Sequence, residues 1–362
     1  MTVGALRFLD PGDRTTRRTW DEITRSSPGA TVFHTTAWMD VVQQGLGLKP
    51  RFAYLARASG DMCALIPLFQ AEGMLRPVRW LNLPQSCAAD PLAARADDKR
   101  VLLEQLTEAA DRNGVAGFVL RTSHDPRPAL PTGWKRNRDR SLVRHVIPLG
   151  GSKDIGALPG LQRRQRERFR SSKRTLQASG YRSQLATIDE ANAFARAVHH
   201  ILLRRHGHLG MPHSFFTALL RNLPGIARLA SISDPHGRIL AFVVTLWDLG
   251  RCDFLYGSGS PSKSGEDAYR VCLESEIEAA IAAGLEVFDM HETNPDNHGL
   301  IISKQRWGAR QADGSYLILA REGADCALHV DGKGFRPARR LLRHAPVGLS
   351  MALSGAVHRA LQ

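Results

Sequence analysis

The sequence predicts an α+β protein with two similar domains, each a mixed, mostly antiparallel sheet flanked by helices. Three observations support this prediction. The chain has 362 residues, which is longer than one typical domain. Short apolar runs separated by turn residues alternate with amphipathic helical patterns. The order of patterns in the first half returns more clearly after a Gly- and Pro-containing break at 150–159.

The first domain is expected to cover residues 1–150. Thr35 is a candidate N-cap for a helix over 37–44. The run 52–69 indicates a hairpin, because two apolar stretches flank a Ser-Gly turn. The other expected elements are strands at 6–9, 78–81, 117–121 and 142–149 and helices at 17–24 and 97–113.

The second domain is expected at 151–320. Its pattern runs helix, helix, antiparallel meander, helix, strand, short helix, strand, which is the order of a GNAT-type acyltransferase domain. The expected elements are helices at 161–178, 190–205, 214–220 and 268–283 and strands at 181–186, 227–233, 239–246, 252–256, 287–290 and 316–319. A basic tail at 321–362 follows, and it is expected to pack as a helix with a solvated basic face. Contact with a membrane surface or RNA is the alternative for this tail.

Composition favours a globular, basic protein. Hydrophobic content is 43%, and the formal net charge is +14. This charge predicts attraction to polyanions, although a generally basic surface without a specific partner is the alternative.

Cysteine usage and the N-terminus favour a cytoplasmic location. The five cysteines are scattered, without CxxC or Cys/His metal spacing, so neither a metal site nor a disulfide framework is expected. The N-terminus lacks a secretory pattern. The chain also lacks an apolar run of about 18 residues, so no integral membrane contact is expected.

The expected helix 161–178 is dense in positive charge, opposed by Glu167 alone. Like charges at this spacing destabilise an isolated helix, so an anionic partner such as a phosphate backbone would favour it. A solvated face is the alternative. The candidate tRNA-binding residues are Arg163, Arg164, Arg166, Arg168, Arg170, Lys173 and Arg174.

The segment 288–316 contains the candidate catalytic residues. Lys304 follows a short strand and a polar loop, and its ammonium could stabilise the oxyanion formed when an amine attacks an ester or thioester. Asp289 and His291 are candidate bases, with hydrogen-bonded structural roles as the alternative. Trp307 is a candidate substrate-binding residue in the same segment.

Further candidate substrate-binding residues lie elsewhere. Arg204 and Arg205 end a helix together with His206, just before a glycine, although a basic helix end also suits the macrodipole. Phe33, His34 and Trp38 resemble the lip of a pocket, with core packing as the alternative for the two aromatic residues. GxSxG, Walker A, HExxH and dinucleotide-binding motifs are missing from the sequence.

Four stretches resemble motifs of the Fem aminoacyltransferase family and its FemAB-related, GNAT-fold relatives. Residues 31–38 resemble the family's F-Q/H-x-x-x-W signature, and 169–181 resemble its basic helix ending in glycine. Residues 204–216 resemble its R-x-G…P…F-F stretch. Residues 288–308 resemble F-D-F-G…F-K-x-x-W-G. In this sequence His291 replaces the glycine of F-D-F-G, and Ser303 replaces the aromatic residue before the lysine.

The resemblance implies two tandem GNAT-like domains and transfer of an amino acid from aminoacyl-tRNA to an amine. The amine would belong to a peptidoglycan precursor or a natural product, and the acceptor would be a small molecule or peptide. The resemblance also implies that Lys304 steadies the reacting carbonyl and that Arg205 and Tyr256 contact the acceptor.

Because the ester of aminoacyl-tRNA is already activated, neither a covalent enzyme intermediate nor a cofactor is expected. An acyl-CoA-dependent N-acyltransferase is the first alternative, with the turn 257–270 as its phosphate site. A non-enzymatic nucleic-acid-binding protein with degenerate domains is the second.

Overall fold

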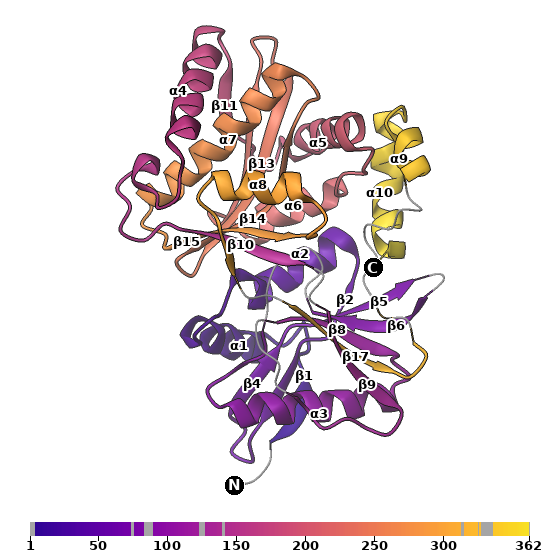
Figure 1. The fold of residues 1–362 in the computed structure, drawn as a ribbon. Helices are drawn as coiled ribbons and strands as arrows, with labels where there is room; N and C mark the ends of the chain where they lie inside the picture. The colour runs from indigo at the N-terminus through magenta and orange to yellow at the C-terminus, as the bar shows by residue number, and fades with distance from the viewer. Residues whose placement is uncertain are drawn as a thin grey trace. The chain divides into compact units, whose positions relative to one another are not determined.

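The computed structural model describes residues 4–73, 76–82, 90–122, 127–139, 142–312, 315–324, 326 and 336–361. Contacts divide the chain into two compact units (Figure 1). Unit 1 comprises Met1–Val143, Asp313–Leu328 and Arg359–Gln362, and unit 2 comprises Arg144–Ala312 and His329–His358.

Unit 1 contains two sheets and several helices. The helices are α1 (Arg14–Ser26), the short 3-10 helix η1 (Val32–His34), α2 (Thr36–Leu46) and α3 (Ala96–Arg112). One sheet has the order β1-β3-β4-β7, made of Ala5–Phe8, Ala53–Ala56, Met62–Ile66 and Leu92–Ala93. The other has the order β2-β5-β6-β8-β17-β9, made of Lys49–Pro50, Phe69–Gly73, Arg76–Leu81, Gly117–Thr122, Ser315–Arg321 and Trp134–Asp139.

Local signals explain where α2 begins and ends. The side chain of Thr35 accepts a 3.2 Å hydrogen bond from the backbone N–H of Trp38, which confirms the expected N-cap. The helix ends at Gly47, whose φ of 71° is left-handed and therefore favours glycine. Trp38 and Phe33 pack edge to face in the core of unit 1, with ring centroids 5.0 Å apart.

Unit 2 is built on one sheet with the order β11-β12-β13-β14-β15-β10-β16. In the same order, these strands are Arg182–Leu185, Ala227–Ser233, Ile239–Asp248, Arg251–Gly259, Val287–Thr293, Val143–Pro148 and Arg310–Ala312. The helices are η2 (Ile155–Ala157), α4 (Arg163–Ala178), α5 (Ala191–His206), α6 (His213–Asn222), α7 (Lys263–Ala282), α8 (His298–Arg306), α9 (Arg336–Leu342) and α10 (Val347–Leu361).

The sheet of unit 2 lies between two pairs of helices. Side chains of a strand alternate between its faces. Val243 of β13 therefore joins the buried cluster formed with α4 and α7, whereas its neighbour Phe242 packs on Phe194 of α5. This sandwich buries both faces of β13 and holds its pairing with β12 and β14 in place.

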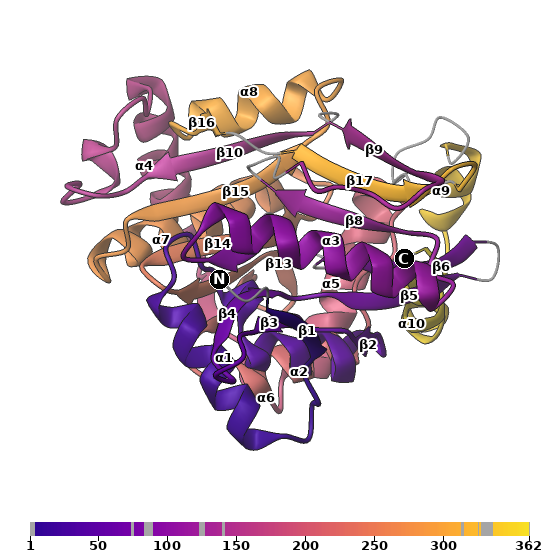
Figure 2. The ribbon, with the colours of Figure 1, turned by 90° about the horizontal axis from the view of Figure 1, so that it is seen from below.

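Two strands differ from the continuous domains expected from the sequence. Strand β10 was expected in the first domain, but it pairs with β16 in the sheet of unit 2. Strand β17 was expected in the second domain, but it lies between β8 and β9 in unit 1 (Figure 2). The two units thus exchange strands, and the boundary at 150/151 does not separate them.

Helices α9 and α10 of the C-terminal tail pack on unit 2. Arg204 of α5 donates to the carbonyl oxygens of Arg343 and Ala345, which lie between α9 and α10. Gly207 ends α5 with a left-handed φ of 66°, and a Cβ at this position would overlap the carbonyl of Arg339. The predicted substrate-binding residue Arg204 therefore fixes the tail.

Candidate active site

The candidate active site lies where β14 and β15 stop pairing. These strands run parallel, and within the described residues their pairing extends from Arg251↔Val287 to Asp253↔Asp289. Both strands continue, β14 to Gly259 and β15 to Thr293. One edge of β14 therefore offers backbone N–H and C=O groups that an extended ligand could pair with, as an added strand would.

An irregularity in β14 accompanies this divergence. The register with β13 shifts so that Val244 lies opposite Tyr256 while Thr245 lies opposite Phe254, which leaves one extra residue in β14. Such a bulge bends its strand and turns the side chains that follow. Tyr256 therefore packs against Phe216 and Phe242, on the side of α5 and α6.

The hydroxyl of Tyr256 is buried at this site. It has no hydrogen-bond partner among the described residues. Burial raises the pKa of Tyr256 well above its ordinary value, so the group remains a neutral phenol. A buried hydroxyl in this state can donate to a ligand carbonyl or amine.

The junction of β14 and α7 is tightly built. A Cβ at Gly259 would overlap the carbonyl of Gly265, so only glycine allows β14 to approach the first turn of α7 this closely. The side chain of Ser262 accepts a 3.1 Å hydrogen bond from the N–H of Gly265 and caps α7. The exposed start of a 20-residue helix thus follows directly on the free edge of β14.

Arg205 holds this junction. Its guanidinium donates to the carbonyl oxygens of Gly259 and Ser260, the latter at 3.2 Å, and pairs with Glu266 of α7. Sequence reasoning predicted a substrate-binding residue here. The structure instead shows an arginine that shapes the loop between β14 and α7.

His206 is the titratable group that the sequence-based candidates missed. Its Nε2 lies 3.2 Å from the hydroxyl oxygen of Ser258 on β14. Partial burial, together with the positive charges of Arg205, His208 and Arg343, lowers the pKa of His206 to about 4. The imidazole is therefore neutral near pH 7. In the sequence it stands at a basic helix end, where Arg204 and Arg205 drew the prediction.

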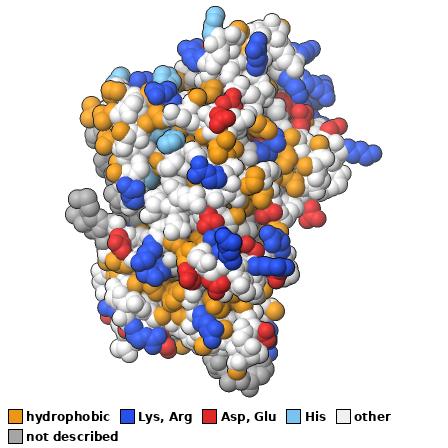
Figure 3. All heavy atoms as spheres, turned by 180° about the vertical axis from the view of Figure 1, so that it is seen from behind, with side chains coloured by type: hydrophobic (Ala, Val, Ile, Leu, Met, Phe, Trp, Pro, Cys, Tyr) orange, Lys and Arg blue, Asp and Glu red, His pale blue; other side chains and the backbone are white. Residues whose placement is uncertain are grey.

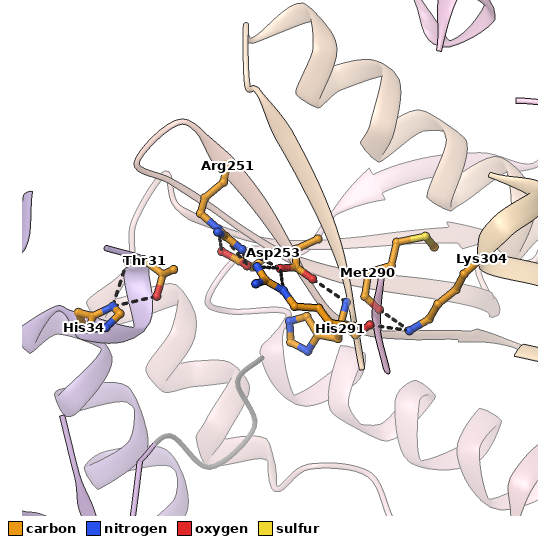
Figure 4. Close-up of polar contacts among 9 residues, drawn as sticks. Thr31, His34, Arg251, Asp253, Met290, His291 and Lys304 are labelled. Carbon is orange, nitrogen blue, oxygen red and sulfur yellow. Dashed lines mark hydrogen bonds and ion pairs between the residues drawn. The ribbon is translucent and has the colours of Figure 1, made fainter. Parts of the chain in front are cut away.

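Lys304 is buried and donates to three backbone carbonyls. Its Nζ donates to the carbonyl oxygens of Met290 and His291 at 2.6 and 2.9 Å (Figure 4). It also donates to the carbonyl oxygen of Glu292 at 3.2 Å. Successive carbonyls of a regular strand point to opposite edges. Three in a row can meet one ammonium because His291 has a left-handed φ of 60°. In this arrangement Lys304 fixes the end of β15.

Asp289 belongs to a buried ion cluster. It accepts from Arg144 Nε at 2.8 Å and from Arg251 Nη2 at 2.8 Å, and Arg251 also pairs with Asp253 at 2.7 Å. Burial disfavours the charged form of Asp289, but the positive charges of Arg144, His291 and Arg251 outweigh it and lower its pKa to about 2.

The ion pairs of this cluster occupy the carboxylate of Asp289. Its side chain is fully buried and engaged by Arg144 and Arg251. His291 donates its backbone N–H to Asp289 Oδ1 at 2.9 Å, so the cluster also helps to hold the left-handed residue. Asp289 and His291 thus shape the point at which β14 and β15 separate.

Two other sets of predicted substrate-binding residues are core residues. Phe33, His34 and Trp38 are fully buried in unit 1, where His34 contacts the backbone and hydroxyl of Thr31, both at 3.1 Å (Figure 4). Trp307 is buried in unit 2, where it stacks on Phe169 of α4 with ring centroids 4.2 Å apart. Apolar and aromatic packing explains these positions.

The predicted basic face of α4 is present in part. Phe169, Ser172 and Leu176 face the sheet, so the remaining positions point outward. Arg166 donates to the carbonyl of Gly156, and Lys173 pairs with Glu278, so these two belong to the packing of α4. Five arginines are exposed on α4: Arg163, Arg164, Arg168, Arg170 and Arg174. Figure 3 shows Lys and Arg side chains gathered at the upper right, where α4 lies.

The cysteines of unit 2 do not form a nucleophilic site. Cys252 and Cys272 are buried in its core, and burial raises the pKa of both thiols well above the ordinary value. Among the described residues, no group of His, Cys, Asp and Glu is placed to hold a metal ion. In the same part of the chain, no helix is long and apolar enough to cross a membrane.

Comparisons with known proteins identify the fold. Residues 163–296 match the family described as an acetyltransferase (GNAT) domain. Curated protein sequences gave no match. Three similar solved structures are FemX, L-PGS from Bacillus licheniformis and a tandem GNAT protein from the clavulanic acid biosynthesis pathway.

All three likenesses extend over most of both chains. FemX has a TM-score of 0.62 at 13% identity, over 86% of this chain and 96% of its own. L-PGS has 0.54 at 15% identity, over 96% and 97%. The tandem GNAT protein has 0.55 at 12% identity, over 88% and 99%. The chain therefore shares the fold of these structures, with two GNAT-like units.

Proposed function

We propose that this protein is an aminoacyltransferase that moves an amino acid from aminoacyl-tRNA to an amine and forms an amide. The amine belongs to a peptidoglycan precursor or another small molecule or peptide. The observation that supports acyl transfer is the separation of β14 from β15 beside the start of α7, within reach of neutral His206.

The reaction needs no covalent enzyme intermediate. The amine nitrogen attacks the ester carbonyl, the new C–N bond forms, and the ester C–O bond to the tRNA ribose breaks. His206 accepts the proton that the amine loses, and the ribose oxygen takes up a proton as it leaves. The buried, protonated thiols of Cys252 and Cys272 agree with direct transfer.

The exposed arginines of α4 support a tRNA donor. Ser172 of α4 donates to Asp267 in the first turns of α7 at 3.1 Å, so the basic helix lies beside the helix that borders the site. Counterion release from phosphates would favour a polyanion on this face. Lys304 is a positioning residue in this proposal, because it fixes β15 at the point of divergence.

An acyl-CoA donor is the second candidate, and one observation favours it. The exposed start of α7 carries Ser262 and Ser264, and helix N-termini bind phosphates well. However, Glu266 places a negative charge in the first turn. That carboxylate would oppose a pyrophosphate unless Arg205 continued to pair with it.

Donor consumption decides between these candidates. The full chain is incubated with a pool of charged tRNAs or with a pool of acyl-CoAs, each with a mixture of amines, and loss of the acyl group is followed. Accelerated deacylation of tRNA with amide formation is expected. Consumption of acyl-CoA alone would overturn the choice of donor, and consumption of neither would overturn the proposed reaction.

Binding to uncharged tRNA tests the α4 face separately. Replacing Arg164, Arg168, Arg170 and Arg174 by serine should weaken binding and flatten its dependence on salt, by roughly one unit of logarithmic slope per lost phosphate contact. Serine in place of Arg14, Arg18, Arg25 and Arg112, four exposed arginines of unit 1, provides a matched control. Equal binding by the α4 variant and this control would place the RNA elsewhere.

A further inference from the structure

Helix α10 buries serine side chains and exposes leucine side chains, which is the reverse of the usual arrangement in a surface helix. Ser350 and Ser354 are 2% and 0% exposed, whereas Leu349 and Leu353 are 53% and 48% exposed. Ala352 and Ala356 are exposed as well, so the outward residues recur at helical spacing. A helix that packs only against its own protein would turn these leucines inward.

Specific hydrogen bonds hold this reversed orientation. Nδ1 of His199 lies 2.7 Å from the hydroxyl oxygen of Ser350. Nε2 of His358, further along α10, lies 3.1 Å from the carbonyl oxygen of Gly210. Together with the bonds of Arg204 to the segment before α10, these contacts fix which face points outward.

The neighbouring helix α9 extends the apolar surface and surrounds it with positive charge. Leu341 is 77% exposed, and Arg340 and Arg343 beside it are exposed. The sequence from Arg336 to Gln362 contains five arginines and no acidic residue. Figure 3 shows hydrophobic side chains at the upper left, over the edge where Figure 1 places α9 and α10.

We propose that α9 and α10 form a docking surface for an anionic membrane. Interfacial helices insert an apolar face into the boundary between headgroups and acyl chains and keep arginines near the phosphates. The surface binds from outside the bilayer, so it requires no membrane-spanning segment. The inference is independent of the proposed reaction.

Other occupants fit this surface less well. A stable dimer interface buries about 800 Å² per partner, far more than three leucine side chains provide. An RNA would use the arginines but would leave the leucines exposed to water. A lipid surface can contact the leucines with its acyl chains and the arginines with its phosphates.

Vesicle sedimentation of the full chain tests the proposal. Wild-type protein should bind vesicles of phosphatidylcholine with about 30% phosphatidylglycerol and should not bind pure phosphatidylcholine. The double variant Leu349→Ser, Leu353→Ser should bind at least about tenfold more weakly, because two side chains no longer enter the acyl region. The variant Arg340→Ser, Arg343→Ser should lose roughly tenfold or more, and about 0.5 M salt should have a similar effect on the wild type.

Leu185→Ser is the matched control, because Leu185 is an exposed leucine on β11, away from this surface. Since all the substituted side chains are exposed, melting temperatures should stay close to wild type. Equal binding by the leucine variant and the wild type would overturn the proposal, as would binding that ignores the anionic lipid. A dimer that depends on Leu349 and Leu353 would assign the surface to a second copy instead.

Discussion

The ammonium of Lys304 donates a 2.6 Å hydrogen bond to the carbonyl oxygen of Met290. The carbonyls of His291 and Glu292 complete a set of three acceptors around the same nitrogen. At the end of β15, the side chain of Lys304 thus supplies the hydrogen bonds that the backbone N–H groups of a neighbouring strand would otherwise donate. These hydrogen bonds give Lys304 a structural role, which is distinct from the direct contact with a reacting carbonyl that the resemblance implies.

Replacing Lys304 by methionine should destabilise the protein. The change keeps the length of the side chain but leaves three carbonyls without their shared donor, so the free energy of unfolding should fall by at least about 2 kcal/mol. Urea unfolding measures this loss. An unchanged midpoint combined with lost transfer activity would instead support direct action of Lys304 on the substrate.

His291→Gly tests the conformation at the same turn. The φ of His291 is 60°, which glycine adopts without steric cost and a β-branched residue adopts poorly. The free energy of unfolding should stay the same or rise by up to about 1 kcal/mol in the glycine variant, and it should fall by roughly 2 kcal/mol in His291→Val.

The activity of these two variants gives a second outcome. If His291 only shapes the turn, the glycine variant retains aminoacyl transfer. A glycine variant that is as stable as the wild type but inactive would show that the imidazole itself takes part in the reaction.

Much of unit 2 could be predicted from the sequence because its signals are local. The helical periodicity of α7 and the turns between β12, β13 and β14 each depend on neighbouring residues. The exchange of β10 and β17 could not be predicted, since strand pairing joins residues that are distant in the chain. The apolar pattern of a strand does not specify which sheet the strand joins.

The sequence assigned the candidate residues to elements but could not give the contacts of their side chains. Asp289 was expected on the strand 287–290 and Arg205 at the end of a helix, and they lie on β15 and α5, while Lys304 lies on α8. Their roles depend on the direction of each side chain, which a left-handed residue and two arginine partners determine. His291, which stands where the related motif has glycine, was the available signal for the left-handed turn.

Acid pH should lower the free energy of unfolding because Asp289 becomes protonated. Its pKa is about 2 in the folded state and about 3.8 in an unfolded chain. A lowered folded pKa contributes stability above the unfolded value, and that contribution disappears as the pH falls from about 4 to about 2. The shift corresponds to about 2 kcal/mol.

Urea unfolding at a series of pH values checks this loss. Asp289→Asn should remove the part of the acid dependence that falls in this window. It should also be less stable than the wild type near neutral pH, because Arg144 and Arg251 lose a charged partner. Wild-type and variant curves that fall in parallel below about pH 4 would place the acid-sensitive group elsewhere.

The proposed role of His206 predicts the pH profile of transfer. Its pKa of about 4 keeps the imidazole neutral across the physiological range, so the imidazole should add no acid limb to kcat/KM until near this value when the acceptor is an amine of low pKa that stays neutral over the same range. His206→Gln preserves a polar side chain but cannot act as a base, and kcat should fall by about a hundredfold or more. His208→Gln is the matched control, because its ring centroid lies 6.3 Å from that of His206, just beyond the end of α5. Comparable kcat values in both variants, or an acid limb near the ordinary histidine pKa of about 6.5, would remove His206 from the proton transfer.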